Sequence, residues 1–416
     1  MKNRKTKAAR IPEPKCLACG ILPFVTALKT AKRTPLVKLQ LTLVLIAAIS
    51  GIPARAQDAP PLTISSPLEY QVFQRSTRLH GVIIVSGAAL AATRVEARVE
   101  GTSIAGPLPG RWQRLTLDPA KKQFSGQLPV IAGGFYRVEI KTTNKVGQPT
   151  LLTVPNVGVG EVFIIAGQSN STNYGEATQT TQTGMVTSFS GTEWSLANDP
   201  QPGVQDNSRK GSFIPSFGDA LYRRYRVPIG IASVGHGSTS VRQWLPADTP
   251  IHVMPTMTRY VRTNSDGTRV SDGTLFAGMM LRIHQLGDHG FRALLWHQGE
   301  SDSHQPAEHD IDADTYRTMM ATIIQASRKQ AGWDLPWFVA QATYHTPDDP
   351  SSPPIRDAQR SLWQPDLAIE GPDTDTLTAP YRQNGGKGTH FNDAGLKAHG
   401  LLWADKVSQY LDTVLR

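Results

Sequence analysis

The stretch VFIIAGQSNSTNYG, residues 162–175, decides the fold of this chain. Its first part, VFIIAG, is an apolar run of the length and composition of a fully buried strand, which is typical of a parallel sheet covered on both faces. The run ends on Ala-Gly, and Gln168, Ser169 and Asn170 follow it. A serine in this place is either an ordinary turn residue or a nucleophile displayed at the end of a buried strand.

Downstream of VGVGE (157–161), strand-like apolar runs alternate with helix-like segments. The runs are VFIIAG, VPIGIASV, FRALLWH and PWFVAQATY, and helices are expected at 213–225, 275–289, 314–331 and 392–415. This alternation predicts a three-layer α/β domain over about 157–416, with a parallel sheet between helices. Two long polar excursions, 176–212 and 245–274, are expected to be loops that serve a site.

Residues 57–155 show a different pattern of short strand-like runs separated by Gly, Pro, Asn or Asp. Segments such as RVEARVE and YRVEIKT alternate apolar and polar residues, which is the period of a half-buried strand. The pattern predicts a small all-β sandwich of the Ig-like kind. Because it holds no cluster of titratable residues, we expect an accessory domain with a structural or carbohydrate-facing role.

The first 56 residues resemble a secretory leader. A basic stretch precedes the apolar run LQLTLVLIAAISGI (39–52), and the small-x-small triplet ARA follows at 54–56. The run is short for a membrane span, which takes about 20 residues. We therefore expect cleavage after Ala56 and export to the periplasm or medium, with a single membrane anchor as the alternative.

The net charge of +9 also belongs to this leader. Residues 1–56 hold eleven Lys and Arg and one acidic residue, so 32 basic and 33 acidic residues remain and nearly cancel. A nucleic-acid partner is therefore not expected. Cys16 and Cys19 also lie in the leader, so the mature chain would have no cysteine nucleophile and no thiolate metal site.

Polar side chains follow each predicted strand of the α/β domain, and the carboxyl ends of parallel strands share one edge of a sheet. Ser169 follows the first strand, Gly235 the second, Gln298 and Glu300 the third, and Tyr344 the fourth. His390 precedes the last helix. A serine needs a base to take its proton, a group to orient that base, and amide donors for an oxyanion.

The motifs GQSN, VGHGS and WHQGESD, with a late histidine before the terminal helix, resemble the SGNH hydrolases. The match is closest to the sialate O-acetylesterase-like group of carbohydrate acetylesterases and covers about 157–416. The resemblance implies a nucleophile at Ser169 and a base at His390. It also implies an oxyanion hole formed by Ser169, Gly235 and Gln298.

One position departs from this family. Many members place an Asp three residues before the catalytic histidine, where this chain has Lys387. Some relatives use the Glu of the HQGE motif instead, so Glu300 is the first choice for orienting His390 and Asp302 the second. A Ser-His dyad steadied by a backbone carbonyl is the third possibility.

The remaining candidates concern the sugar and a metal. Sugar contacts are assigned to Asn170, Arg242, Trp244 and Tyr344. The stretch from Asp302 to Asp310 is rich in acids and histidines, but it has no HExxH pattern, so no metal and no cofactor is expected. The resulting interpretation is an exported esterase that removes acetyl groups from an O-acetylated glycan or sugar. A non-catalytic carbohydrate-binding protein and a general short-chain ester hydrolase or lipase are the alternatives, and the oligomeric state stays open.

Overall fold

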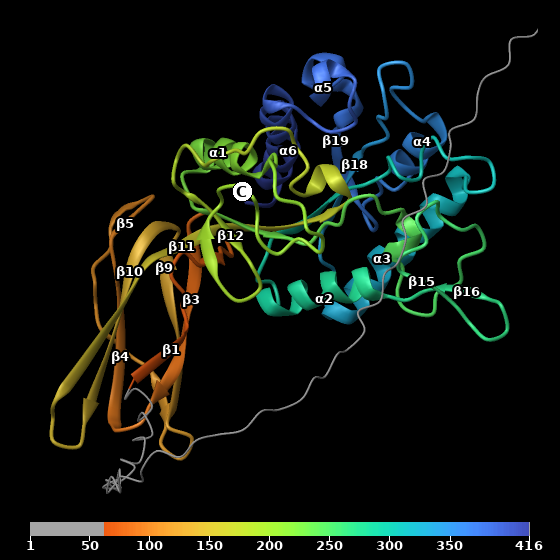
Figure 1. Cartoon of the computed structure of the whole chain (residues 1–416). Helices are drawn as coiled ribbons and strands as arrows, with labels where there is room; N and C mark the ends of the chain where they lie inside the picture. The colour runs from red at the N-terminus through yellow and green to blue at the C-terminus, as the bar shows by residue number, and fades with distance from the viewer. Residues whose placement is uncertain (1–61, 416) are drawn as a thin grey trace, which may run out of the picture. The chain divides into compact units, whose positions relative to one another are not determined.

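The structure, a computed structural model, describes residues 62–415 (Figure 1). The basic leader, its apolar run, the expected cleavage after Ala56 and both cysteines lie outside the described residues. Within the described range, no helix has both the length and the apolar character that crossing a bilayer requires.

Short strands fill the chain from residue 62 to residue 144. One four-stranded sheet has the order β1-β3-β9-β8, and β10, β4 and β7 belong to a second, larger sheet. The bounds are β1 (Leu62–Ser66), β2 (Val72–Gln74), β3 (His80–Ala89), β4 (Ala92–Glu100), β5 (Thr102–Ser103), β6 (Gly106–Pro107), β7 (Gln113–Arg114), β8 (Thr116–Asp118), β9 (Gln123–Ile131) and β10 (Gly133–Asn144). In β3, buried positions alternate with more exposed ones, as the period of a half-buried strand requires.

The long strand β11 (Pro149–Gly167) forms both antiparallel and parallel pairs. Its first half pairs antiparallel with β10, and its second half pairs parallel with β14 (Ile229–Ser233) and β17 (Ala293–His297). The strand therefore runs without a break through residues 155–157, where the sequence predicts a domain boundary.

The parallel part of the sheet has the order β12-β14-β11-β17-β18-β19, with β13 antiparallel at its edge. The new bounds are β12 (Val186–Phe189), β13 (Trp194–Leu196), β18 (Trp337–Gln341) and β19 (Ile369–Asp373). Because β11 comes first in the chain and its neighbours β14 and β17 follow it on opposite sides, the switch point of the topology lies between β11 and β17. Ligands of open α/β sheets bind at the carboxyl end of such a point.

Helices cover both faces of this parallel sheet, as Figure 1 illustrates. Phe163 and Ile165 share one apolar core with Trp403, whereas Ile164 shares the other core with Met279. The bounds are α1 (Ile214–Tyr225), α2 (Thr274–Leu286), α3 (Ala313–Ala331), α4 (Pro353–Ser361), α5 (Gln383–Gly386) and α6 (Asp393–Val414). The mixed α/β class predicted from the sequence is confirmed.

Several local features differ from the sequence predictions. The excursion 176–212 contains β12 and β13, and the excursion 245–274 contains the hairpin of β15 (Val261–Thr263) and β16 (Arg269–Ser271). Helix α4 was not expected, because its first turn starts on Pro353 and Pro354. Proline is tolerated there since the first helical amides have no partner inside the helix.

Candidate active site

Ser169 stands on a tight turn directly after β11. Gly167 has a φ of +129°, and a Cβ there would lie 2.0 Å from the carbonyl oxygen of His297, so only glycine fits. The hydroxyl of Ser171 donates to the carbonyl of Gln168 at 2.7 Å, and that of Thr172 donates to the carbonyl of Ser169 at 3.0 Å. The turn is thereby held rigid, while the Ser169 hydroxyl has no hydrogen-bond partner among the described residues.

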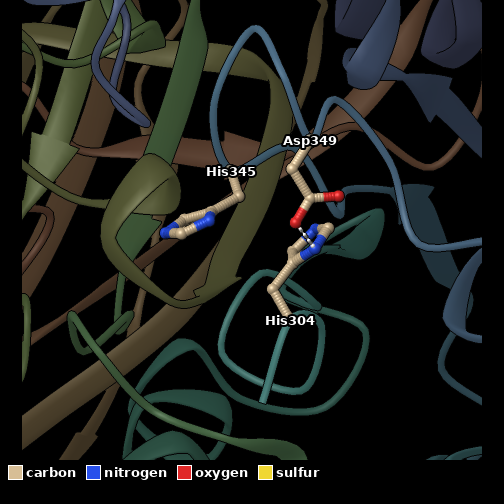
Figure 2. Close-up of side chains that lie close together, drawn as sticks. All are labelled: His304, His345 and Asp349. Atoms are coloured by element: carbon tan, nitrogen blue, oxygen red, sulfur yellow. Dashed lines mark ion pairs between the residues drawn. The ribbon is translucent and has the colours of Figure 1, made fainter. Parts of the chain in front are cut away.

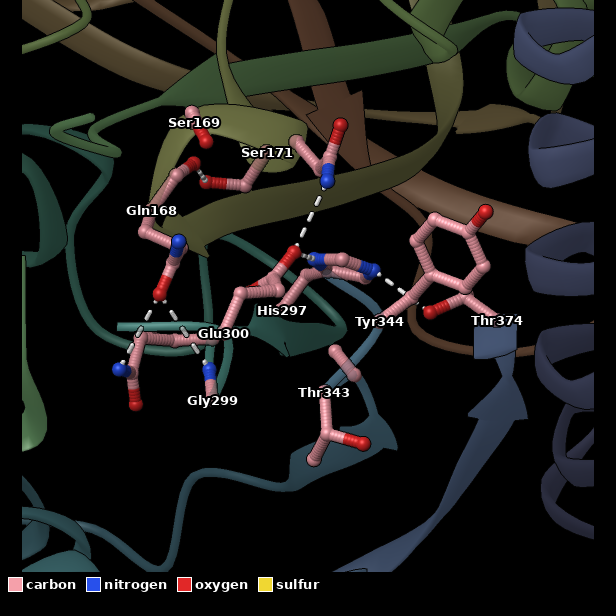
Figure 3. A network of polar contacts seen from close by, with 12 residues as sticks. Gln168, Ser169, Ser171, His297, Gly299, Glu300, Thr343, Tyr344 and Thr374 are labelled. Atoms are coloured by element: carbon pink, nitrogen blue, oxygen red, sulfur yellow. Dashed lines mark hydrogen bonds and ion pairs between the residues drawn. The ribbon is translucent and has the colours of Figure 1, made fainter. Parts of the chain in front are cut away.

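The side chain of Gln168 ties this turn to the end of the neighbouring strand β17 (Figure 3). Its Oε1 accepts from the backbone N–H of Ser301 at 3.0 Å and from Nε2 of Gln298 at 3.3 Å. The ends of β11 and β17 flank the switch point, so this bond fixes the two segments that form the site.

Gly235 lies against the same turn. A Cβ at Gly235 would lie 2.3 Å from Oγ of Ser171 and 2.5 Å from Cγ2 of Thr172, which leaves room for glycine alone. The N–H of His236 donates to the carbonyl of Gly167 at 2.9 Å, but no hydrogen bond within residues 62–415 uses the N–H of Gly235 or of Ser169. Two unpaired backbone donors therefore belong to the segments packed around the serine, as an oxyanion hole requires.

Gln298, the expected third oxyanion donor, is fully buried and already bonded. Its Nε2 donates to Oδ2 of Asp302 at 2.6 Å and to the carbonyl of Thr239 at 3.1 Å, and its Oε1 accepts from the hydroxyl of Tyr316 at 3.1 Å. Asp302 also accepts from the N–H of Val241 at 2.7 Å. Gln298 and Asp302 thus hold the segments around the site together, and no hydrogen bond or ion pair joins Asp302 to His390.

His390 is half-buried on the segment before α6, where its ring lies 5.1 Å from the ring of Tyr174. Burial, with further effects of the Arg382 and Lys210 charges, lowers the pKa of His390 to about 4. The imidazole is therefore neutral at neutral pH and able to accept a proton. Its Nδ1 lies 3.0 Å from Nε2 of Gln383.

Glu300 is buried but does not hydrogen-bond His390. Its Oε1 accepts from Nδ2 of Asn170 at 2.9 Å and lies 3.8 Å from Nδ1 of His297 (Figure 3). The same Asn170 amide lies 3.5 Å from the carbonyl of Thr389, next to His390. The bonds of Glu300 thus reach the histidine segment through Asn170, and the side chain that contacts Nδ1 of His390 is that of Gln383.

The environment of Glu300 leads to a prediction about pH and stability. Burial is the main cause that raises the pKa of Glu300 from 4.5 to about 7. In the unfolded chain the carboxyl ionises near its ordinary pKa, so between these values the folded state binds the extra proton and loses stability as pH rises. The full cost above pH 7 is about 3 kcal/mol.

We expect Glu300→Gln to gain stability relative to the wild type by about this amount between pH 5 and pH 8, because the amide carries no charge to bury. Urea unfolding of both chains at the two pH values measures the difference, and subtraction cancels the titration of the buried histidines. Glu308→Gln, at an exposed position, is the control. A gain from Glu300→Gln that is equal at both pH values would contradict the buried ionisation.

Two supporting residues were not predicted from the sequence, Arg382 and Gln383. Arg382 is buried, and its guanidinium donates to the carbonyls of Leu377 at 2.6 Å, Thr389 at 2.6 Å and Thr374 at 3.1 Å. It therefore shapes the segment that carries His390. The signal available was the polar run YRQNGGKGTH (381–390), but nothing in it told which polar side chain turns toward the histidine.

Two of the four predicted sugar contacts, Trp244 and Arg242, are buried side chains. Trp244 is fully buried and packs edge-on against Trp296, with ring centroids 5.1 Å apart. The guanidinium of Arg242 is also fully buried and bonds the carbonyls of Val253 and His309 at 3.1 and 2.9 Å. Neither side chain presents a surface to a ligand in this structure.

Tyr344 lies beside the site rather than on an open face. Its ring packs against the Arg382 guanidinium at 3.8 Å, and its buried hydroxyl has no partner within the described part of the chain. Asn170, the fourth expected sugar contact, is the bridge between Glu300 and Thr389 described above. Its amide is therefore already occupied by protein acceptors.

The parallel sheet, the serine after its first strand and the free amides around it are features of the α/β class of ester-cleaving enzymes. The chain belongs to the family described as carbohydrate esterase, sialic acid-specific acetylesterase, whose model matches residues 159–409. This match confirms the resemblance to the sialate O-acetylesterase-like group and makes the protein a carboxylic ester hydrolase family member.

One solved structure supports the fold, and a second is reported as a weaker match. XAC1771, described as a novel carbohydrate acetylesterase from Xanthomonas citri, matches with a TM-score of 0.53 and 18% identity, over 85% of this chain and 76% of that one. The Arabidopsis thaliana protein AT4G34215 matches with a TM-score of 0.41 and 17% identity, over 61% of this chain and 98% of that one. No curated protein matches the chain.

Proposed function

We propose that the protein is an exported carbohydrate O-acetylesterase that forms an acetyl-enzyme on Ser169. One observation carries the proposal: at the sheet's switch point, the hydroxyl of Ser169 and the backbone N–H groups of Ser169 and Gly235 all lack a hydrogen-bond partner within residues 62–415. An attacking oxygen and the donors for the resulting oxyanion are the two requirements of acyl transfer. The family of the chain implies an acetylated carbohydrate as the ester.

The proposed steps use Ser169, His390 and water. As Oγ of Ser169 attacks the acetyl carbonyl carbon, neutral His390 takes the hydroxyl proton, and the N–H groups of Ser169 and Gly235 bind the oxyanion. Collapse breaks the bond between the carbonyl carbon and the sugar oxygen, which receives the proton from His390. Water, deprotonated by His390, then attacks the acetyl-serine and releases acetate and free Ser169.

Glu300 takes an indirect part in this proposal. Because it bonds Asn170 and not His390, we assign it to holding Asn170, whose amide also reaches the carbonyl of Thr389. The raised pKa of Glu300 supports this role, since a carboxyl that is half-protonated near pH 7 is a poor partner for stabilising an imidazolium.

We assign the group that positions His390 to Gln383. An imidazole that accepts the serine proton on Nε2 must carry a proton on Nδ1, and the Gln383 amide receives it when Oε1 faces the ring. Gln383→Ala should therefore lower kcat by on the order of 10²-fold with little change in KM. Gln383→Glu should restore activity and move the acid limb of the kcat/KM profile to higher pH, since a carboxylate stabilises the imidazolium.

The control for Gln383 is Lys387→Ala, which alters the exposed position where relatives carry an Asp. We expect it to leave the rate and the pH profile unchanged. An acid limb that stays in place in Gln383→Glu, together with wild-type kcat in Gln383→Ala, would refute a positioning role for this residue.

A substrate panel tests the proposed function itself. Wild-type protein should release acetate from acetylated oligosaccharides, and activity should fall sharply when the acetyl group is replaced by longer acyl chains. A general ester hydrolase or lipase would accept the longer chains. A non-catalytic carbohydrate-binding protein would bind the glycans equally well before and after Ser169→Ala and release no acetate.

We also propose that the first 56 residues direct export and that the strand-rich part of the chain is an accessory domain. The basic, apolar and small-residue order of residues 1–56 supports export to the periplasm or medium. The antiparallel sheet β1-β3-β9-β8 and the partners of β10 support an Ig-like accessory sandwich before the SGNH-type domain. Protease mapping of the mature protein would locate both boundaries.

A further inference from the structure

Outside the proposed active site, two histidines and an aspartate converge from separate segments (Figure 2). His304 lies between β17 and α3, and His345 and Asp349 lie between β18 and α4. One ligand atom from each of the three side chains lies within 4.8 Å of the other two. His304 belongs to the stretch from Asp302 to Asp310 that is rich in acids and histidines, and its two partners lie about forty positions further along the chain.

The local backbone holds the three residues in place. Residues 346 and 349 exchange two backbone hydrogen bonds, Thr346 N–H to Asp349 O at 3.2 Å and Asp349 N–H to Thr346 O at 3.1 Å. This tight turn keeps His345 and Asp349 side by side. His304 is fixed from the other side, because its Nε2 lies 2.8 Å from the carbonyl of Thr343.

The bond to Thr343 determines what His304 presents to Asp349. A carbonyl only accepts, so Nε2 of His304 carries a proton, and Nδ1 of the neutral ring is a lone pair. That lone pair contacts Oδ2 of Asp349, another acceptor. Two acceptors in contact need a shared cation, and at this contact it is a proton on Nδ1. A metal ion would take the place of that proton once the two side chains move slightly apart, because each metal–ligand bond is about 2.0–2.2 Å long. A histidine whose second nitrogen donates to a carbonyl is the usual arrangement of a metal ligand.

His345 favours the metal. Its exposed imidazole makes no hydrogen bond with any described residue, and it stacks on His304 with ring centroids 5.2 Å apart. A proton is shared by only two groups, so a proton between His304 and Asp349 would leave His345 without a role. A metal ion takes further ligands, and the exposed side chain of His345 can rotate to supply the third one.

We propose that His304, His345 and Asp349 bind a divalent transition-metal ion, of which Zn²⁺ is the best match. Two imidazoles and one carboxylate suit Zn²⁺, whereas Mg²⁺ and Ca²⁺ prefer oxygen ligands throughout. Three protein ligands leave a coordination position for water. The site is separate from the acyl-transfer residues, but the hydroxyl of Thr389 donates to the carbonyl of His345 at 3.0 Å, so the metal would brace the segment that carries His390.

Zinc binding to the full chain tests this proposal. Every variant should carry Cys16→Ser and Cys19→Ser and no polyhistidine tag, because thiolates and tags bind Zn²⁺ themselves. Competition with a chromophoric chelator should give one Zn²⁺ per chain, and Co²⁺ should produce the visible absorption of a low-symmetry site. His345→Ala and Asp349→Asn should each weaken binding by more than about tenfold.

The matched control is His289→Ala. His289 and Asp288 form another exposed histidine-aspartate pair, with 3.5 Å between Nε2 and Oδ1, and none of the residues 62–415 adds a third ligand to it. This variant should bind Zn²⁺ like the parent. Ser169→Ala should also bind Zn²⁺ normally while losing esterase activity, so the metal site and the proposed function fail or hold separately.

Two results would overturn the metal site. One is absence of Zn²⁺ and Co²⁺ binding to the parent chain, which would leave His304 and Asp349 as an ordinary ion pair. The other is binding that survives His345→Ala and Asp349→Asn unchanged. A rise in the thermal midpoint on adding Zn²⁺, present in the parent and absent in His345→Ala, would support the site independently of the titration.

Discussion

Ser169→Ala is expected to lower kcat for acetate release from an acetylated oligosaccharide by on the order of 10⁶-fold. The variant keeps both backbone N–H groups but has no oxygen to form the acetyl-enzyme. The remaining rate would come from water attack on an ester held by the same donors. An enzymatic acetate assay over hours, with substrate above KM, separates this residual rate from the spontaneous hydrolysis of the ester.

The control for this variant is the neighbouring Ser171→Ala. The Ser171 hydroxyl donates to the Gln168 carbonyl, so its loss removes one buried hydrogen bond and should change the rate by no more than about tenfold. Equal thermal midpoints for Ser169→Ala and the wild type would show that the fold is intact. Full activity in Ser169→Ala would rule out the proposed nucleophile.

His390→Ala is the second change with a very large expected effect, on the order of 10⁶-fold in kcat, because nucleophile and base act as a unit. Added imidazole should restore part of the rate if the missing group is a base. His289→Ala, at an exposed position remote in sequence, is the control and should retain wild-type activity.

The pH profile of the wild type checks the same residue. A base works only when deprotonated, and the pKa of His390 is lowered to about 4 by burial and nearby positive charges. Activity in kcat/KM should therefore persist below pH 6.5, where an ordinary histidine becomes protonated. A limb near pH 6.5 would show that the imidazole is better solvated than the structure indicates, or that another group titrates.

The sequence predicted most of the fold because its strongest signals are local. The apolar runs around residues 162–167 and 293–297 are strands β11 and β17, and the periodic segment 314–331 is helix α3. Short strands such as β12 have too few residues to show a period. The continuity of β11 was not predicted, because the change of pattern after VGVGE (157–161) suggested a boundary where the strand in fact passes from antiparallel to parallel partners.

The sequence predicted which edge of the sheet carries the site, but it did not predict which side chains face His390. Ser169 and Gly235 come from strand ends, whose place follows from topology alone. Which atom faces His390 depends on side-chain packing, because Gln383 contacts His390 across the loop 382–390 and Arg382 bonds the carbonyl of Thr374 just before it. The burial of Arg242 and Trp244 also depends on packing, because their partners His309 and Trp296 lie in segments distant in the sequence.

The buried positive charge of Arg382 affects several titratable groups around the site. Arg382 has no direct carboxylate partner among its hydrogen bonds, and burial lowers its pKa to about 10. Its positive charge disfavours protonation of His390 and His297, and it partly offsets the burial of Glu300. One arginine thus helps to keep the proposed base neutral while it shapes the segment on which that base lies.

In the proposed mechanism, the acetyl group passes through Ser169. Acid-quenched turnover of wild-type protein with an activated acetyl ester, followed by peptide mass spectrometry, tests it most directly. We expect an acetylated peptide that spans residues 162–175, with the acetyl group on Ser169 and none in the Ser169→Ala variant. An acetyl group on a different side chain, or undiminished turnover by Ser169→Ala, would contradict it.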